Sequence, residues 1–188
     1  MRARSSRCLI LWLATLLPGP VAAQATVTAP SWTRLPSLRF FGFRVGVPRS
    51  EIDSGVADLG GPSLECNRSR VDPRVRDCRT WFLDPITGDR VELWLATMDG
   101  LVGILTVSAP VSDLQLGTWR SSLVSAYGDV PVALQGSQRT LQWIRHRQML
   151  RLTWRVRNER TTASVSLVDG PVVDGWGHRP APPGEEKP

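Results

Sequence analysis

Two stretches of the chain carry apolar residues at helical spacing. In the first, Ile52, Val56 and Leu59 recur every three or four positions, which places them on one face of a helix. Pro48 precedes this run and a Gly-Gly-Pro sequence ends it, and both signals are typical of helix boundaries. The pattern predicts a helix over residues 49–59.

The second helical stretch contains Trp119, Leu123, Ala126 and Tyr127, which share one face. Gly128 follows directly. Glycine often follows the last turn of a helix, because it adopts the left-handed backbone conformation with little strain. The pattern therefore predicts a second helix that ends at Gly128.

Strands are predicted by alternation of apolar and polar residues between turn signals. Seven segments are candidates, with turns such as Asp99-Gly100 between them. They are residues 39–45, 79–83, 90–97, 101–108, 139–145, 149–157 and 162–168.

The order of these elements is similar in the two halves of the chain. Residues 38–108 and residues 112–174 each contain one predicted helix followed by three predicted strands. Short turns separate the strands within each half, which predicts antiparallel neighbours. We expect an α+β fold of two helix-plus-three-strand antiparallel units, consistent with a duplication that forms one domain over residues 38–174.

The first 23 residues have the features of a cleaved secretory signal. Basic residues precede an apolar run at 8–17, a Pro-Gly-Pro sequence breaks it, and Val21-Ala22-Ala23 offers a small-residue cleavage pattern. The run is shorter than the roughly 20 apolar residues that span a bilayer as a helix. We expect an exported protein, in the periplasm of a bacterial envelope or secreted, with residues 24–37 as a linker and no transmembrane segment after cleavage.

Residues 175–188 differ in composition from the predicted domain. They are rich in proline and in charged residues. Such a segment has little apolar surface to bury, and burial is what offsets the entropy lost on folding. We therefore expect a disordered tail over residues 175–188.

The net charge of the chain argues against a nucleic-acid partner. Without the three arginines of the signal, 20 basic residues face 17 acidic ones, which is not the strongly basic balance of nucleic-acid-binding domains. The excess lies in residues 118–175, which hold eight basic and four acidic residues. Of the 23 basic residues, 22 are arginine. A GC-rich coding bias is a sufficient explanation of this number, so the number alone is not evidence of a function.

Cys66 and Cys78 remain as an even pair after signal cleavage. In an oxidising compartment such a pair favours a disulfide. A reactive or metal-binding pair is the alternative, but the spacing is not Cys-x-x-Cys and no histidine lies near in the sequence. The expected bond closes the highly charged segment 67–77 into a loop.

The start of the first predicted helix resembles that of a known family. Residues 46–52 are Gly-Val-Pro-Arg-Ser-Glu-Ile, and Leu59-Gly60 ends the helix. They are similar to the "G-M-S/T-x-x-E-V … L-G" start of small envelope domains, namely the SmpA/OmlA-type outer-membrane lipoproteins and the β-lactamase-inhibitor-like proteins. The resemblance covers residues 46–108 and implies helices against an antiparallel sheet in a protein-binding module. The chain departs from the family at Pro48 and lacks its lipidation cysteine, and no binding residue of the family is carried over.

The predicted strand 149–157 has an apolar face and a basic face. Arg151, Thr153, Arg155 and Arg157 alternate with the apolar residues, and Arg147 lies in the preceding turn. Neighbouring strands are expected to add polar residues to the same face, namely Thr140, Gln142, Thr162, Ser164 and Ser166. Arginine donors in such number suit carboxylate, phosphate or sulfate groups, so Arg147, Arg151, Arg155 and Arg157 are anion-binding candidates. The alternative is an ordinary solvated sheet face.

Trp94 is a candidate for contact with a partner. In the predicted strand 90–97 it lies with Arg90 and Glu92, opposite the apolar positions. An exposed tryptophan is a frequent anchor of protein interfaces. The alternative, which the sequence favours, is that the other half of the chain covers this face.

The sequence contains no recognisable catalytic or metal-binding constellation. His146 lies in a predicted turn, where a histidine is usually exposed, and His178 lies in the tail. There is no G-x-S-x-G sequence, and two distant histidines do not make a metal site. We expect neither a cofactor nor a metal.

The expected function is that of an exported, non-catalytic binding domain that recognises another envelope or secreted protein. The first alternative is a binder of anionic polymer or glycolipid through the arginine-rich sheet face. A remote alternative is an unrecognised hydrolase that uses His146.

Overall fold

The computed structural model describes residues 37–176. The predicted signal, almost all of the predicted linker and residues 177–188 of the predicted tail lie outside the described residues. Within the described range the elements are, in chain order, α1 Arg49–Asp58, β1 Glu65–Arg68, β2 Val75–Leu83, β3 Arg90–Met98, β4 Leu101–Val111, α2 Asp113–Tyr127, β5 Ala133–Gln135, β6 Gln138–Arg145, β7 Gln148–Arg157, β8 Arg160–Asp169 and α3 Gly170–Val173.

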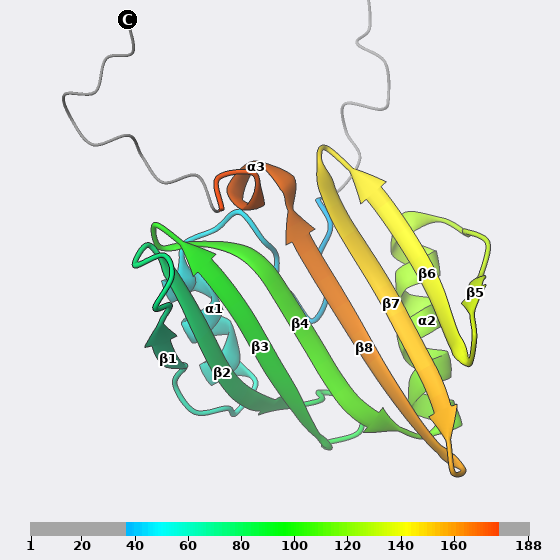
Figure 1. Cartoon of the computed structure of the whole chain (residues 1–188). Coiled ribbons are helices and arrows are strands. Elements are labelled where there is room, and N and C mark those ends of the chain that lie inside the picture. The colour runs from blue at the N-terminus through cyan, green and yellow to red at the C-terminus, as the bar shows by residue number, and fades with distance from the viewer. Residues whose placement is uncertain (1–36, 177–188) are drawn as a thin grey trace, which may run out of the picture. The chain divides into compact units, whose positions relative to one another are not determined.

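The eight strands form one antiparallel sheet (Figure 1), in the order β1-β2-β3-β4-β8-β7-β6-β5. Each half of the chain contributes a meander of four neighbouring strands, and the halves join where β4 pairs with β8. The expected fold of two helix-plus-three-strand units is therefore wrong. β1 and β5 add a fourth strand to each half, and hydrogen bonds between β4 and β8 merge the halves into a single sheet.

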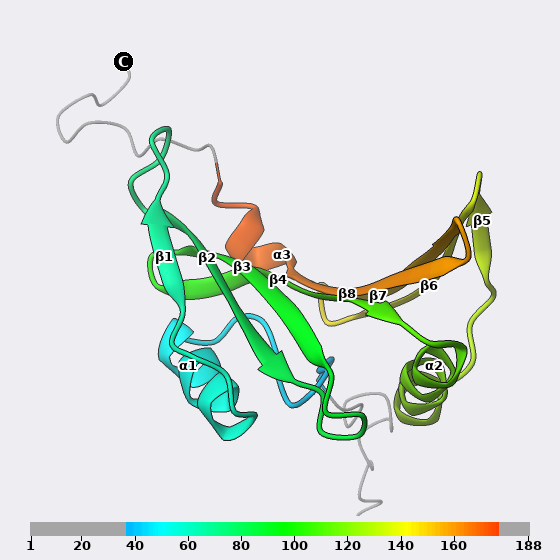
Figure 2. The same ribbon diagram turned by 90° about the horizontal axis from the view of Figure 1, so that it is seen from below.

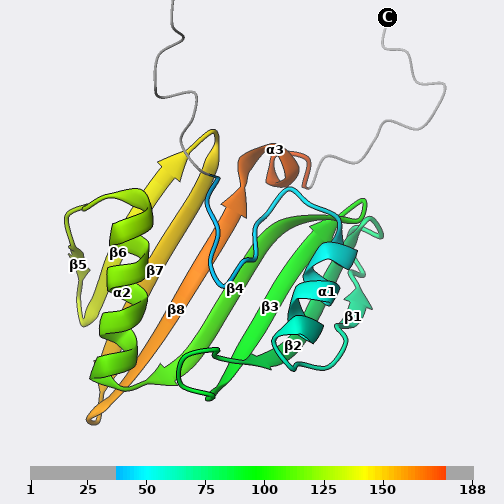
Figure 3. The ribbon, with the colours of Figure 1, turned by 180° about the vertical axis from the view of Figure 1, so that it is seen from behind.

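Both long helices cover the same face of the sheet (Figures 2 and 3). Residues 38–47 run between α1 and α2 (Figure 3) and contribute Leu38, Phe40 and Phe43 to the core. The core lies between this layer and the sheet, where Phe82, Leu105 and other apolar strand residues are fully buried. Within residues 37–176, no helix has both the length and the apolar character needed to cross a membrane.

The strand predicted over residues 39–45 is wrong. Phe40 and Phe43 pair their backbones in a tight turn, with N–H···O distances of 3.0 and 2.9 Å. Phe41 (φ +50°) and Gly42 (φ +82°) occupy the left-handed region at its tip. The aromatic side chains of this segment fill the space between the two helices, so its apolar pattern reflects core packing and not a place in the sheet.

The predicted helix boundaries are close to those observed. α1 begins directly after Pro48 and its C-terminal cap is Leu59. α2 ends before Gly128, whose φ of +90° no other residue type adopts readily. At its start the Ser112 side chain accepts a hydrogen bond from the Gln115 backbone N–H at 3.2 Å, which satisfies one donor of the first turn.

A buried carboxylate ties α2 to the turn between β2 and β3. Asp84 is 1% exposed, and its Oδ2 accepts hydrogen bonds from Gln115 Nε2 at 2.9 Å and from Trp119 Nε1 at 3.1 Å. Its Oδ1 accepts from the backbone N–H of Ile86 at 2.9 Å. Burial alone would raise the pKa of Asp84, but these hydrogen bonds hold it below its ordinary value.

Two-residue turns set the register of three hairpins. Asp99-Gly100, His146-Arg147 and Asn158-Glu159 all have positive φ at both positions, the conformation whose twist suits a tight hairpin. The register in turn decides which residues lie side by side on each face of the sheet.

Candidate functional site

The face of the sheet opposite α1 and α2, here called the open face, is the main candidate site. Figure 2 shows the sheet curving so that its outer strands β1 and β5 rise on this side. The helical covering that the described residues place there is α3, at one end. Val172 and Trp176 lie close to Gly103 of β4, where an added Cβ would meet them at 2.9 and 3.4 Å. The rest of the open face lies toward the viewer in Figure 1.

Hydroxyl side chains occupy the centre of the open face. The register places Thr106 of β4 beside Ser166 of β8, with 3.0 Å between their hydroxyl oxygens. Ser108 pairs with Ser164 in the next row, and Thr153 of β7 follows on the other side of Ser164. Because these side chains are short, no large group projects from the centre of the open face. Their hydroxyl groups offer both hydrogen-bond donors and acceptors.

Arg151 and Arg155 project from β7 beside this hydroxyl centre. Arg151 donates from Nε and Nη2 to Gln142 Oε1 at 3.0 and 2.8 Å, and Arg155 Nη2 donates to Gln138 Oε1 at 3.1 Å. Among the described residues, neither guanidinium has a carboxylate within 4.0 Å. The glutamines thus hold both side chains without neutralising their charge.

The other two arginine candidates lie away from this pair. Arg147 is in the β6–β7 turn, where its Nη2 contacts Asp174 Oδ2 at 2.5 Å. Arg157 is at the far end of β7, opposite Arg160 across the β7–β8 hairpin. The four arginines therefore extend along the whole strand, and only Arg151 and Arg155 face the hydroxyl centre.

Trp94 lies on the open face, on the other side of the hydroxyl centre from Arg151. It is flanked by Arg79 of β2 and Thr106 of β4, and its Nε1 donates to Asp77 Oδ1 at 2.5 Å. The expectation that the other half of the chain covers this face is wrong around Trp94, because both halves lie side by side in one sheet and α3 of the second half packs over the face at one end, near Gly103.

Charges around Trp94 are paired, in contrast to those on β7. Arg79 lies 3.9 Å from Asp77, and Arg90 lies 3.0 Å from Glu92 while its guanidinium stacks over the Trp81 ring at 4.8 Å. Sequence analysis missed Trp81 and Arg79 as neighbours of Trp94. The alternation within β2 contained the signal, but only the register of β2 against β3 brings these residues together.

A hollow of 410 Å³ adjoins Trp94 and is lined also by Arg79, Glu92 and Ser108. It lies over β2, β3 and β4. An aromatic wall with charged and hydroxyl groups around it suits a side chain that has an apolar body and a polar end.

The predicted disulfide is present. Cys66 and Cys78 are bonded across β1 and β2, and they are direct partners in the strand register. Residues 67–77, expected to be a loop, are instead the ends of these two strands and the hairpin between them. The bond fastens the edge strand β1 to the sheet, at a distance from β7.

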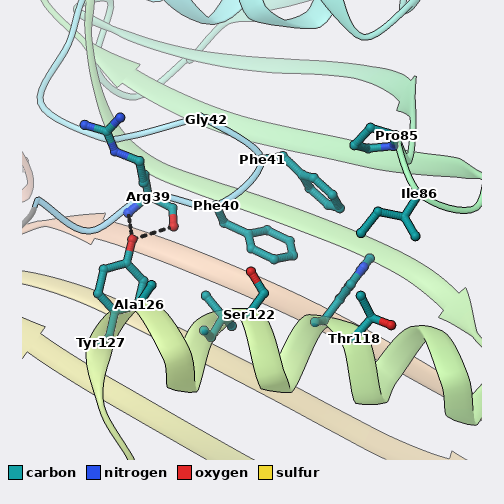
Figure 4. A pocket seen from close by; sticks show the side chains of 12 residues that line it. Arg39, Phe40, Phe41, Gly42, Pro85, Ile86, Thr118, Ser122, Ala126 and Tyr127 are labelled. Atoms are coloured by element: carbon teal, nitrogen blue, oxygen red, sulfur yellow. Dashed lines mark hydrogen bonds between the residues drawn. The ribbon is translucent and has the colours of Figure 1, made fainter.

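A second hollow lies on the helix side of the sheet, between α2 and the turn at residues 40–43 (Figure 4). It has a volume of 300 Å³ and apolar walls that include Phe40, Phe41 and Ile86. Tyr127 closes one end, since its hydroxyl accepts from the Arg39 N–H and donates to the Arg39 carbonyl oxygen, both at 2.8 Å. These bonds hold the N-terminal segment against α2.

No catalytic group is assembled around His146. It occupies the exposed β6–β7 turn with φ +49°, and none of the described hydrogen bonds or ion pairs involves its ring. Residues 37–176 also contain no group of three or more His, Cys, Asp or Glu side chains placed to hold a metal ion. The expectation that the protein is not an enzyme stays a prediction.

Comparison with known proteins gives no further guide to this site. No family model, no curated protein and no solved structure matches the chain. The resemblance of residues 46–108 to small envelope domains therefore stays a prediction.

Proposed function

We propose that this protein is an exported, non-catalytic binding domain that recognises another protein with its open face. The observation that carries the proposal is the lack of a covering layer over this face, apart from α3 at one end, in the described part of the chain. An antiparallel sheet of this width commonly has one solvated face, but such a face does not need an aromatic anchor and two unneutralised arginines.

The dimensions of the open face are those of a protein interface. Its six inner strands, spaced about 4.8 Å apart, give a width of roughly 25 Å, and nine residues of strand give a length of roughly 30 Å. The area is therefore roughly 750 Å², close to the 800 Å² or so that one partner contributes to a standard complex. A small-molecule site does not require so wide a surface.

The side chains of the open face also suit a protein partner. Trp94 is half-buried and offers the exposed part of its ring to a partner, and tryptophan and arginine are the residue types most often found to dominate binding energies. The hydroxyl rows between Trp94 and Arg151 supply adaptable hydrogen bonds to backbone groups. A partner with an acidic edge would complement the β7 side of the face.

A second candidate function rests on Arg151 and Arg155 alone. Because no carboxylate neutralises them, they are available to an anionic polymer or glycolipid of the cell envelope. Such binding is mainly electrostatic and weakens steeply with salt, whereas an interface with an apolar anchor weakens less.

A pull-down from an envelope fraction separates the two functions. The bait is the chain from residue 24 with its disulfide intact, compared with Trp94→Ala and with Arg151→Glu/Arg155→Glu, each washed at low and high salt. A discrete protein retained at high salt by the native bait and lost with Trp94→Ala supports the proposal.

The control is Arg120→Glu/Arg139→Glu, which makes the same charge change on the helix side of the sheet and should retain the partner. Glycolipid or polymer that is retained only at low salt and lost with the β7 variant would replace the proposed function by the second candidate. A protein retained equally by all four baits would place the interface elsewhere.

A further inference from the structure

A groove on the helix side of the sheet, distant from the open face, has the features of a ligand site. It has a volume of 540 Å³ and lies between the first turns of α2 and the β5–β6 hairpin. Figure 3 shows β5 at the outer edge of the sheet, beside α2. The volume is within the range of small-molecule sites in proteins.

The groove has an apolar floor and an apolar wall. Leu116 of α2 and Trp154 of β7 are both buried, at 8% and 4% exposure, and form the floor. On the outer wall Val132 is 42% exposed and Leu134 of β5 is 72% exposed. Leu134 pairs with Arg139, which pairs with Trp154, so the three side chains lie in one row. An exposed apolar wall over a buried apolar floor marks a surface that gains free energy when covered.

Gly117 leaves the groove open on the helix side. It is an interior residue of α2 and lines the groove, and a Cβ added to it would meet no atom within 4 Å. Glycine is among the least favourable residues within a helix. Neither a close approach nor a positive φ requires glycine here, and the space beside it in the groove is empty.

Two arginines border the groove. The Arg120 guanidinium stacks over the Trp154 ring at 5.1 Å, and Arg139 lies on β6. Within residues 37–176, neither has a carboxylate within 4.0 Å. Asp113 also lines the groove, but it is the first residue of α2, where the helix dipole stabilises its charge. Two arginines against one aspartate leave the border with a net positive charge.

We propose that this groove binds a single-chain amphiphile with an anionic headgroup, of the fatty-acid class. The hydrocarbon chain lies over Gly117, between Leu116 and the exposed wall of Val132 and Leu134, and the headgroup pairs with Arg139 and with Arg120, which stacks over the Trp154 ring. Apolar burial and charge-assisted hydrogen bonds then act on opposite ends of one ligand. The inference does not depend on the function of the open face.

Titration with decanoate below its micelle concentration tests this site. Binding is measured by calorimetry on the chain from residue 24, and the Gly117 amide signal is followed by NMR. We expect saturable 1:1 binding, at least tenfold weaker binding of the cationic decyltrimethylammonium ion, and a shift of the Gly117 signal. Arg120→Gln/Arg139→Gln should weaken decanoate binding at least tenfold, while the matched pair Arg151→Gln/Arg155→Gln on the open face should change it less than twofold.

Two further variants test the apolar half of the groove. Gly117→Trp fills it and should abolish binding, and Leu134→Asp should do the same from an exposed position that folding does not need. Gly117→Ala should raise the melting temperature and keep binding within a few fold.

Several results would overturn the proposal. These are no saturable binding, equal binding of the cationic amphiphile, equal losses in the two arginine pairs, or binding only to anionic vesicles and not to free decanoate. A concentration-dependent dimer that Leu134→Asp dissociates would show that a second copy fills the groove instead.

Discussion

Trp94 and Arg151 lie in the same row of the open face, with Thr106 and Ser166 between them on the two central strands. Three strand spacings separate them, about 14 Å. Trp94 lies among the paired charges of the first half of the chain. Arg151 is one of the two unneutralised arginines of the second half. A partner that contacts both must therefore span the junction between the halves.

Trp94→Ala and Arg151→Ala should weaken partner binding independently. Each removes a residue of the type that dominates interfaces, so we expect a loss of about 2 kcal/mol, or about thirtyfold in Kd, for each. Because the residues are separated by roughly 14 Å and share no contact, the two losses should add in the double variant. Affinities measured by calorimetry on the four proteins check this, and Leu114→Ala, an exposed position on α2 at the opposite side of the sheet, serves as the control. A double variant no weaker than one single variant would contradict a shared interface.

Asp84→Asn should destabilise the protein by about 3 kcal/mol. Asparagine keeps one acceptor oxygen where Asp84 has two, so it cannot accept both from the Gln115 and Trp119 side chains on one side and from the Ile86 backbone N–H on the other, and at least one buried donor loses its partner. Asp89→Asn, an exposed position in the same turn, should change the stability by less than about 0.5 kcal/mol. Urea unfolding followed by tryptophan fluorescence measures both. Equal stabilities of the two variants would rule out an anchoring role for Asp84.

Asp84 should also contribute to the acid sensitivity of the fold. Its pKa in the folded protein lies below the value of about 3.9 that it has when unfolded. The charged form therefore stabilises the fold above about pH 4, and this contribution is lost as the pH falls through the folded pKa. Melting temperatures measured from pH 6 to pH 2 should fall more steeply for the native protein than for Asp84→Asn. Parallel curves would contradict the assignment.

Removal of the Cys66–Cys78 disulfide should lower the stability by roughly 2–4 kcal/mol, the usual effect of a bond that closes a short loop. The double variant Cys66→Ser/Cys78→Ser should also free β1 at the sheet edge, so its amides should exchange faster with solvent than those of β7. Chemical denaturation and hydrogen exchange measure the two effects. Unchanged exchange of the β1 amides would contradict this role of the disulfide.

Glu159→Gly should stabilise the protein by about 1 kcal/mol. Glu159 has φ +60° in the β7–β8 turn, a conformation that costs free energy for residues with a side chain but not for glycine. The resulting Asn-Gly sequence is the preferred one for this turn. Thermal unfolding checks the change, with Glu65→Gly in β1 as a control that should not stabilise. A lower melting temperature for Glu159→Gly would mean that its side chain makes a contact worth more than the strain.

The sequence predicted the regular parts of this fold well. Alternation in residues 149–157 placed Arg151, Arg155 and Thr153 together on one face, and the structure has them there. The predicted disulfide and the helix end at Gly128 are also observed. In each case the signal is local, since it depends on neighbouring residues or on a simple count of cysteines.

What the sequence did not predict depends on contacts between distant residues or on short segments. β5 has three residues, all exposed, and β1 has four mostly exposed ones, so neither shows alternation. Residues 39–45 looked like a strand because their apolar residues fill a core. Pairing of β4 with β8 joins residues about sixty positions apart, and no local sequence pattern predicts this pairing. Without that pairing, Trp94 and Arg151 could not be assigned to one surface.

The central position of β8 has a consequence for how the sheet is completed during synthesis. Among the strands of residues 37–176, β8 is the last to emerge, yet it fills the middle of the sheet between β4 and β7. Until it arrives, the four strands of the first half end in an unpaired β4, a template for association with other chains. A chain truncated before Arg160 would therefore lack the strand that joins the two halves of the sheet, and not merely an edge strand. We expect such a chain to aggregate. Longer chains face the same exposure while residues 112–169 are synthesised, which makes the speed of synthesis part of what this fold requires.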